Sequence, residues 1–394
     1  MKSLRVLVTD GEQRSALAVV RSLGRANHQV EVTSASGRSI SGASRYSGEE
    51  HLIPDPLSEP DACGTAILDL VERRRIDVLV PITEASLRVI LPLRSRLSGV
   101  LLPFADAETF AAVSDKTRIL EQARSVGIAV PEQVILKDRS VPAAELPEYP
   151  LVLKPYVSVI RDGNRNRKLG VAHAADRTEL EDVLHALPDA AFPVMAQRRI
   201  VGPGVGIFIL RWEGRTIARF AHRRIREKPP SGGVSAYRES ITVPETWFEQ
   251  SELLLNRLHW TGVAMVEYKV EDRSGRPFLM EINGRFWGSL QLAIDAGVDF
   301  PRLLLEAASG ESKPVPPVYR SGVRLRWEWG DLDHLLARLR RSDATLHLPD
   351  RSPSRIVAIL RVLLLWRPGE RWEVLRPDDP RPFLRESALW LRRR

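Results

Sequence analysis

The chain has 394 residues, 43% of them apolar, and a formal net charge of +8, which is typical of a soluble protein large enough for two or three lobes. Its one cysteine, Cys63, excludes a disulfide framework within the chain and agrees with a reducing cytoplasm, where we expect the protein to reside. We expect no signal peptide, and the longest apolar run, residues 356–366, is interrupted by Arg361 and too short to span a bilayer.

The beginning of the chain has the pattern of an open α/β lobe. Residues 4–10 read as a buried strand, residues 16–23 as an amphipathic helix, and residues 30–33 as a second strand, which together predict a β-α-β unit. The turn at residues 9–12 lacks the G-x-G-x-x-G spacing that lets a backbone approach a pyrophosphate. This argues against a dinucleotide-dependent oxidoreductase.

A further strand is predicted at residues 76–81, and Thr83 and Glu84 follow at its carboxyl end. Ligands of open α/β sheets bind at that edge, so both residues are candidates for a substrate pocket. The alternative is that they only begin and cap a helix.

Two of the chain's eight lysines lie at positions where binding of a ligand phosphate would account for their positive charge. Lys154 lies near the end of an apolar strand predicted at residues 149–155, and a cation in that position needs an anionic partner. Lys116 begins a helix predicted at residues 115–126. For Lys116 the alternative is a solvated lysine at a helix end.

Two polar segments follow. Residues 158–170 contain three arginines and Lys168 but only two glycines, so they either hold an anion with side chains or form an exposed basic loop. Residues 222–240 are rich in charge, glycine and proline, which predicts a long loop. Such loops are frequently functional, although a basic surface loop would have the same composition.

A pair of strands is the most informative part of the sequence. Residues 262–270 and 278–282 read as buried strands, and residues 271–276 as the hairpin turn between them. Side chains alternate faces along a strand, so Glu281, Asn283 and Arg285 share one side, and Glu267 on the paired strand lies beside them.

These side chains would form a floor that suits Mg²⁺, which prefers hard oxygen ligands. Arg285 would hold an anion beside the metal by a charge-assisted contact. The alternative is an ordinary hairpin whose acids face water and whose Asn283 caps the next helix.

Glu267 with Glu281-x-Asn283-x-Arg285 resembles the metal-binding signature of the ATP-grasp superfamily, in which two such strands hold Mg–ATP. The continuation through residues 286–301 is similar to the carboxylate–amine ligase branch, of the type of the carbamoyl-phosphate synthase large subunit.

This resemblance covers about residues 1–310 and implies an α/β and α+β protein with an ATP-grasp fold and an N-terminal Rossmann-like lobe. It further implies a ligase that uses ATP and Mg²⁺, with Mn²⁺ as an alternative metal. The ligase would join a small carboxylate to an amine through an acyl phosphate and release ADP and phosphate.

The resemblance also implies roles for individual residues. Glu267, Glu281 and Asn283 would bind the metal. The nucleotide would be bound by Lys116, Lys154, Lys168, Gln197 and Ile200, with Gln197 at a position that usually holds a glutamate. Three arginines near the γ-phosphate are expected to be catalytic: Arg285, Arg238 and Arg224. The residues expected to bind the substrates are Thr83, Glu84, His222, Ser231, Gly232 and Gly233.

The expected organisation is an N-terminal lobe at residues 1–110, a linker helix and lid at 111–197, a large subdomain at 198–310, and an extension of unknown role at 311–394. From residue 331 onward the chain has 14 arginines and no lysine against nine acidic residues, so much of the positive charge is local. We expect its apolar run to pack on the protein, with contact to an anionic membrane as the less favoured reading.

Two other functions remain as alternatives. A carboxylase or carbamoyl-phosphate-type enzyme would phosphorylate bicarbonate on the same floor. A basic-tailed protein bound to nucleic acid or a membrane is the alternative of another class, although the arginines do not alternate with aromatic residues in a recognisable module, so no nucleic-acid partner is expected. The oligomeric state is open, with a homodimer as one alternative.

Overall fold

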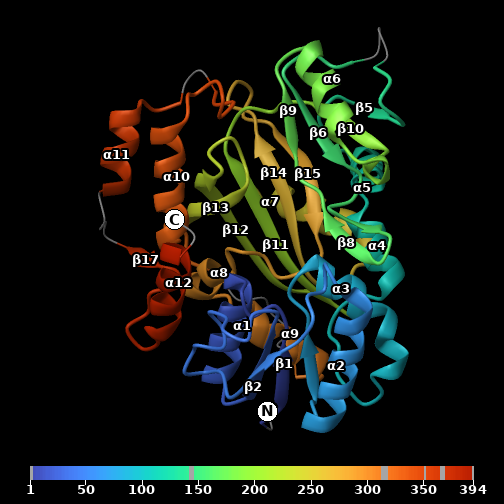
Figure 1. Cartoon of the computed structure of the whole chain (residues 1–394), viewed down its shortest axis with the longest axis vertical. Coiled ribbons are helices and arrows are strands. Elements are labelled where there is room, and N and C mark those ends of the chain that lie inside the picture. Colours follow the sequence, from blue (N-terminus) through green and yellow to red (C-terminus); the bar gives the residue numbers. More distant parts are fainter. Residues whose placement is uncertain (1–2, 142–145, 312–317, 350–351, 364–368, 393–394) are drawn as a thin grey trace.

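The computed structural model describes residues 3–141, 146–311, 318–349, 352–363 and 369–392. Figure 1 shows an N-terminal lobe at one end, a lid at the other, a large sheet between them, and the C-terminal extension along one side of that sheet. The mixed helix and sheet architecture confirms the predicted α/β and α+β class.

The N-terminal lobe is built on a parallel sheet of strand order β3-β2-β1-β4. In its central strand β1 the three consecutive apolar residues Val6, Leu7 and Val8 are 0% exposed, as is typical of a strand inside a parallel sheet. The predicted β-α-β unit is therefore present. The strands are β1 (Arg5–Val8), β2 (Gln29–Ser34), β3 (Glu50–Leu52) and β4 (Val78–Val80), and the helices are α1 (Arg14–Arg25), α2 (Pro60–Arg74), α3 (Glu84–Ile90) and the short 3-10 helix η1 (Leu91–Arg96).

Two helices, α4 (Ala107–Ser114) and α5 (Lys116–Ser125), lead from this lobe to the lid. Helix α5 begins where predicted because the Asp115 side chain accepts hydrogen bonds from the backbone N–H groups of Thr117 and Arg118. The cap fixes Lys116 at the first position of the helix, and its side chain is 9% exposed.

The lid has an antiparallel sheet of order β5-β10-β6-β9. A separate hairpin, β7 (Val159–Asp162) with β8 (Arg165–Lys168), occupies the segment for which two readings were open. The other elements are β5 (Gln133–Leu136), β6 (Leu151–Pro155), β9 (Ala172–Ala174), β10 (Val194–Arg198), α6 (Arg177–Ala186) and the 3-10 helix η2 (Asp189–Ala191).

The largest sheet has the order β15-β14-β11-β12-β13-β16-β17. Its apolar side chains share one continuous core with those of the N-terminal lobe, so these two parts are joined by a common interior. The elements here are β11 (Gly204–Trp212), β12 (Arg215–Lys228), β13 (Val234–Ser240), β14 (Gly262–Val270), β15 (Pro277–Asn283), α7 (Glu245–Arg257), α8 (Leu290–Ala296) and α9 (Phe300–Ala308).

The long loop predicted at residues 222–240 is wrong in extent. Most of the segment is paired in β12 and β13, and only residues 229–233 connect them. Charges that suggested a loop are neutralised by partners elsewhere, for example Arg226, whose Nη2 donates to Asp331 Oδ2 at 2.6 Å. Such partners are distant in sequence, so the composition alone misleads.

The C-terminal extension is part of the same body. β16 (Arg324–Arg326) pairs with β13 and β17 (Glu370–Trp372) pairs in parallel with β16, so two strands of the large sheet come from residues beyond 310. Helix α10 (Glu328–Arg340) packs on β12 and β13, and α12 (Arg381–Arg392) follows at the end.

The expected packing of the apolar run 356–366 is partial. In α11 (Arg355–Leu363), Ala358 and Val362 are buried, whereas Ile356, Leu360 and Leu363 are exposed. Residues 364–366 lie outside the described part of the chain. Within the described residues, no helix has the length and apolar character that crossing a membrane requires.

Candidate functional site

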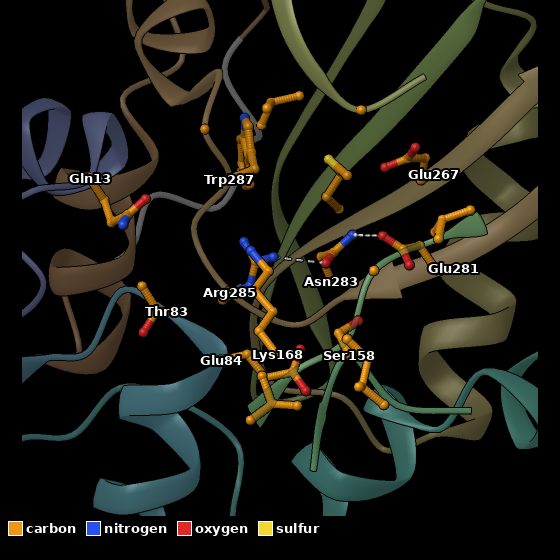
Figure 2. Close-up of a pocket in the computed structure, with 18 of the residues that line it drawn as sticks. Gln13, Thr83, Glu84, Ser158, Lys168, Glu267, Glu281, Asn283, Arg285 and Trp287 are labelled. Carbon is orange, nitrogen blue, oxygen red and sulfur yellow. Dashed lines mark hydrogen bonds between the residues drawn. The ribbon is translucent and has the colours of Figure 1, made fainter. Parts of the chain in front are cut away.

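The two predicted acids are cross-strand partners on the large sheet. Strand pairing sets Glu267 of β14 opposite Glu281 of β15, and a register shift follows directly after this pair. Figure 2 shows both carboxylates on one side of the strands, with a chain of hydrogen bonds beside them. Arg285 Nη2 donates to Asn283 Oδ1 at 3.1 Å, and Asn283 Nδ2 donates to Glu281 Oε1 at 2.9 Å.

The two carboxylates differ in electrostatic environment. Burial alone would raise the pKa of Glu281, but Lys116, the hydrogen bond from Asn283, and Lys154 lower it to about 2. Burial raises the pKa of Glu267, with Arg224 opposing and Glu281 adding to the rise. Arg224 Nη2 lies 2.5 Å from Glu267 Oε2. Two desolvated carboxylates this close favour a cation between them.

Both predicted lysines reach this floor. Lys116 Nζ lies 3.5 Å from Glu281 Oε2 and donates to Ser158 Oγ at 2.8 Å. Lys154 Nζ lies 3.6 Å from the sulfur of Met280, which is a weak acceptor. Burial lowers the pKa of Lys154 to about 8 despite the nearby Glu281. Its ammonium group therefore keeps hydrogen-bonding capacity for a ligand anion.

The β7–β8 hairpin brings Lys168 to the same space and closes it against the N-terminal lobe. Asn166 donates from its backbone N–H to the carbonyl of Leu57 at 2.6 Å, and Arg161 Nη2 lies 3.0 Å from Asp61 Oδ2. Side chains, rather than the backbone of a glycine-rich flap, present the positive charge here.

The hinge from lid to large sheet carries Gln197 and Ile200, both buried and both lining the cavity. Gln197 Nε2 donates to Gln133 Oε1 at 2.6 Å, which orients the amide across β10 and β5. Ile200 packs with Phe278 and Met280 in a small apolar cluster.

The opposite wall comes from the N-terminal lobe. Thr83 caps α3 and also donates from Oγ1 to Asp10 Oδ1 at 2.9 Å, so capping and a place in the cavity wall coexist. Glu84 pairs with Arg88 at 3.1 Å and lines the cavity as well. In Figure 2, Gln13, Thr83 and Glu84 face the floor from across the cavity.

The loop between β12 and β13 forms the third side. Ser231, Gly232 and Gly233 line the cavity, as does Arg224, which also pairs with Glu227 at 3.0 Å. Gly232 has a φ of 133°, and a Cβ on Gly233 would meet the carbonyl oxygen of Lys228 at 2.5 Å. Glycine is needed at both positions for the turn itself.

Two predicted residues are not brought to the cavity. Arg238 is fully buried, donates to the carbonyl of Ser235 at 3.0 Å and pairs with Glu373 of the extension. His222 is packed against Phe208 with ring centroids 4.8 Å apart, and burial lowers its pKa well below the usual value. Both belong to the layer beneath the site.

Several lining residues escaped the sequence reasoning. Asp10 follows β1 at the sheet edge, a position that could have suggested it, and it accepts hydrogen bonds from Thr83 and Ser86. His173 and Pro349 carried no signal, since one lies in a short lid strand and the other in the extension.

Together these elements enclose a cavity of about 860 Å³, a size that accommodates a nucleotide-sized ligand and a small substrate. Acidic and amide oxygens gather on the β14–β15 floor, cations surround them, and the N-terminal lobe supplies the far wall. Such a site can hold a polyanion with a divalent cation next to a second, smaller molecule.

A family model described as "ATP-grasp in the biosynthetic pathway with Ter operon" matches residues 191–330, which include the floor. No curated protein matches the chain in sequence. Many solved structures share the fold.

The L-amino acid ligase of Bacillus licheniformis is 18% identical, with 79% of this chain and 76% of that one covered and a TM-score of 0.62. The biotin carboxylase domain of the Hydrogenobacter thermophilus 2-oxoglutarate carboxylase, a dimer in complex with MgADP, ADP and bicarbonate, is 15% identical (82% and 74% covered, TM-score 0.63). The N5-carboxyaminoimidazole synthetase of Staphylococcus aureus is 14% identical (81% and 81% covered, TM-score 0.59). The predicted fold is thereby confirmed, and the match to the family model covers residues 191–330.

Proposed function

We propose that the chain, which has the fold of ATP-grasp proteins and matches an ATP-grasp family model over residues 191–330, is an ATP- and Mg²⁺-dependent ligase. It activates a small carboxylate as an acyl phosphate and transfers the acyl group to an amine, with release of ADP and phosphate. The observation that carries this proposal is the floor on which Glu267, Glu281 and Asn283 stand next to Lys116 and Lys154.

The donor set fits a hard divalent cation. Glu281 stays ionised at neutral pH because its pKa is about 2, and Glu267 lies opposite it on the paired strand. Asn283 offers an amide oxygen that now accepts from Arg285. Glu267, Glu281 and Asn283 would hold Mg²⁺, which when bound neutralises charge on the β- and γ-phosphates.

The nucleotide would lie between the lid and the large sheet. Lys154, Lys116 and Lys168 supply three positive charges for its phosphates, and Gln197 and Ile200 would line the nucleobase end. Binding of a phosphate would also stabilise the ammonium form of Lys154, whose desolvation is now poorly compensated.

The chemistry then depends mainly on position and charge. One oxygen of the substrate carboxylate attacks the γ-phosphorus, and the bond from that phosphorus to ADP breaks. The amine nitrogen next attacks the acyl carbon, loses a proton and expels phosphate. Arg285 and Arg224 lie at the floor, where they can neutralise the transferred phosphoryl group and the carboxylate.

The organic substrates would occupy the space between the floor and the N-terminal lobe. Thr83 and Glu84 on one side and Ser231, Gly232 and Gly233 on the other line this part of the cavity. We propose these residues as the substrate contacts. His222 and Arg238 are not proposed as contacts, because they are buried beneath the cavity and do not line it.

The test is a matrix of small carboxylates and amines, assayed for ADP release by the purified protein with Mg²⁺ and ATP. We expect ADP only when a suitable acid is present, and an amide in equal amount when the amine is added. Hydroxylamine should trap the intermediate as a hydroxamate. Release of ADP with bicarbonate alone would assign the protein to the carboxylase type, and release of AMP would refute the proposal.

A further inference from the structure

One end of the cavity is formed by a row of side chains across the lid sheet. Strand pairing aligns Gln197 of β10 with Val152 of β6, and Val152 with His173 of β9. All three residues line the cavity. Lys154, two positions further along β6, points to the same side and reaches the floor, so the row lies next to the phosphate-binding end.

The extension reaches this row through the loop that follows α10. The ring of His347 stacks on the ring of His173 with centroids 5.4 Å apart and an interplanar angle of 21°. Arg199 Nη2 in the hinge donates to the carbonyl oxygen of His347 at 2.5 Å. Pro349, two residues on, lines the cavity itself. Figure 1 shows the orange-red segment after α10 at the lid end of the large sheet.

This loop has a defined conformation. Thr345 donates its backbone N–H to Ser342 Oγ at 3.1 Å, and Leu346 is buried at 3% exposure. His347 has a φ of 46°, a left-handed conformation that non-glycine residues rarely adopt. Such a conformation persists when its surroundings fix it, which here are the hinge and the lid.

The His173 side chain is neutral and has an unused hydrogen-bonding nitrogen, as expected of a ligand-binding group. Burial lowers its pKa to about 4, and Arg199 and His347 add to the effect, so the ring is neutral near pH 7. Its Nδ1 is buried and makes no hydrogen bond to any residue that the structure describes. A flat neutral ring with an unused nitrogen suits an aromatic base better than an anion.

We infer that the loop at residues 342–349 of the extension is one wall of the nucleobase end of the cavity, and that His347 positions His173 there to set nucleotide affinity and base preference. This rests on the proposed function only for the identity of the ligand as a purine nucleoside triphosphate. The extension is held by strands β16 and β17 in the large sheet, so the stack also joins the lid to that sheet.

The experiment compares ADP binding, with Mg²⁺ present, between the full-length wild-type protein, His347→Ala and His347→Phe by calorimetry. A stacked ring contributes modestly, so His347→Ala should weaken ADP binding about three- to tenfold and reduce the preference for ADP over CDP. His347→Phe should restore much of the affinity. The lid histidine His185, which is exposed on α6, gives the matched control His185→Ala, expected to change neither quantity.

Kinetics separate positioning from a purely structural role. His347→Ala should raise the KM for ATP several-fold and leave kcat within about twofold, because the wall contacts the base and not the transferred phosphoryl group. If His347→Ala does not fold, Pro349→Ala serves as the second variant, with a smaller expected loss of ADP affinity.

Two results would overturn the inference. Unchanged ADP affinity and base preference in the folded variant, with normal binding by the wild type, would refute this role alone. A wild-type protein that binds neither ADP nor ATP would refute the proposed function and this inference with it.

Discussion

Arg21 and Asp379 are separated by 358 positions in the sequence and form an ion pair of 2.9 Å in which each side chain is 1% exposed. Arg21 also donates to the carbonyl oxygen of Val374 at 2.9 Å, and Ser44 Oγ donates to Asp379 Oδ2 at 2.7 Å. The first helix of the N-terminal lobe is thus fastened to the extension. A segment beyond the family match therefore adds a second connection to the lobe, beside the core that the lobe shares with the large sheet.

Replacing Arg21 with Met should destabilise the protein by about 3–5 kcal/mol, because Asp379 would stay buried without its cation. Urea unfolding measures the loss. The double variant Arg21→Met/Asp379→Leu should recover much of the stability, since no unpaired charge remains.

The neighbouring pair Arg25–Asp378 is the matched control. Its side chains are 39% and 44% exposed, so Arg25→Met should cost less than about 1 kcal/mol. An equal loss in both single variants would contradict the assignment of Arg21 as a buried anchor.

Glu281→Gln should abolish Mg²⁺-dependent ATP turnover and leave the melting temperature within a few degrees of the wild type. The amide keeps the size of the side chain but removes the negative charge that faces Lys116 and the proposed metal. Turnover against Mg²⁺ concentration is the measurement, with the exposed Glu249→Gln on α7 as control. Normal turnover in folded Glu281→Gln would remove this residue from the metal site.

Loss of the proton from Lys154 should make kcat/KM for ATP fall on the alkaline side of its pH profile. Its pKa is about 8 in the ligand-free protein because burial disfavours the ammonium form. As pH rises through 8 the side chain loses the charge that the phosphates require, so kcat/KM should fall. Lys154→Arg should shift this fall to higher pH at some cost in rate, whereas the exposed Lys137→Arg should not. The same fall in wild type and Lys154→Arg would refute the role.

The attachment of the extension should depend on pH through Glu328. Burial raises the pKa of this carboxyl to about 7, although the N–H of Leu375, at 2.7 Å, opposes the rise. Because the pKa of Glu328 is higher in the folded protein than in the unfolded one, this carboxyl stabilises the fold less as pH rises. The stabilisation is complete below about pH 4.5 and is lost as pH rises through about 7.

The wild type should therefore lose about 3 kcal/mol of unfolding free energy from this group between pH 4.5 and 8. Glu328→Gln should lack that component, and urea unfolding at several pH values compares the two. Parallel pH profiles for the two proteins would show that Glu328 does not titrate in this way.

The parts of the fold and of the site that could be predicted are those determined by residues close together in the sequence. Strands β14 and β15 are short apolar runs, and period-two alternation is enough to put Glu281 and Asn283 on one side. Lys154 was identifiable because a cation in an apolar strand requires a partner. The cap at Asp115 likewise fixes Lys116 from adjacent residues alone.

The unpredicted parts depend on partners far along the chain. Arg238 lies in a basic segment and was predicted to be catalytic. In the structure Glu373, 135 positions later, neutralises its charge inside the core. The segment around Arg238 was predicted as a loop because the acidic partners of Arg226 and Lys228 lie 105 positions further along the chain. The stack of His347 on His173 joins residues from two lobes, and no local pattern marks either.

The most direct test of the ligase proposal uses the acid that supports ADP release, labelled with ¹⁸O in its carboxylate. If an acyl phosphate forms, one labelled oxygen stays with the phosphorus when the amine displaces phosphate, so each ADP should be accompanied by one ¹⁸O-containing phosphate. Mass spectrometry of the phosphate measures this. Unlabelled phosphate formed together with the amide would contradict the account.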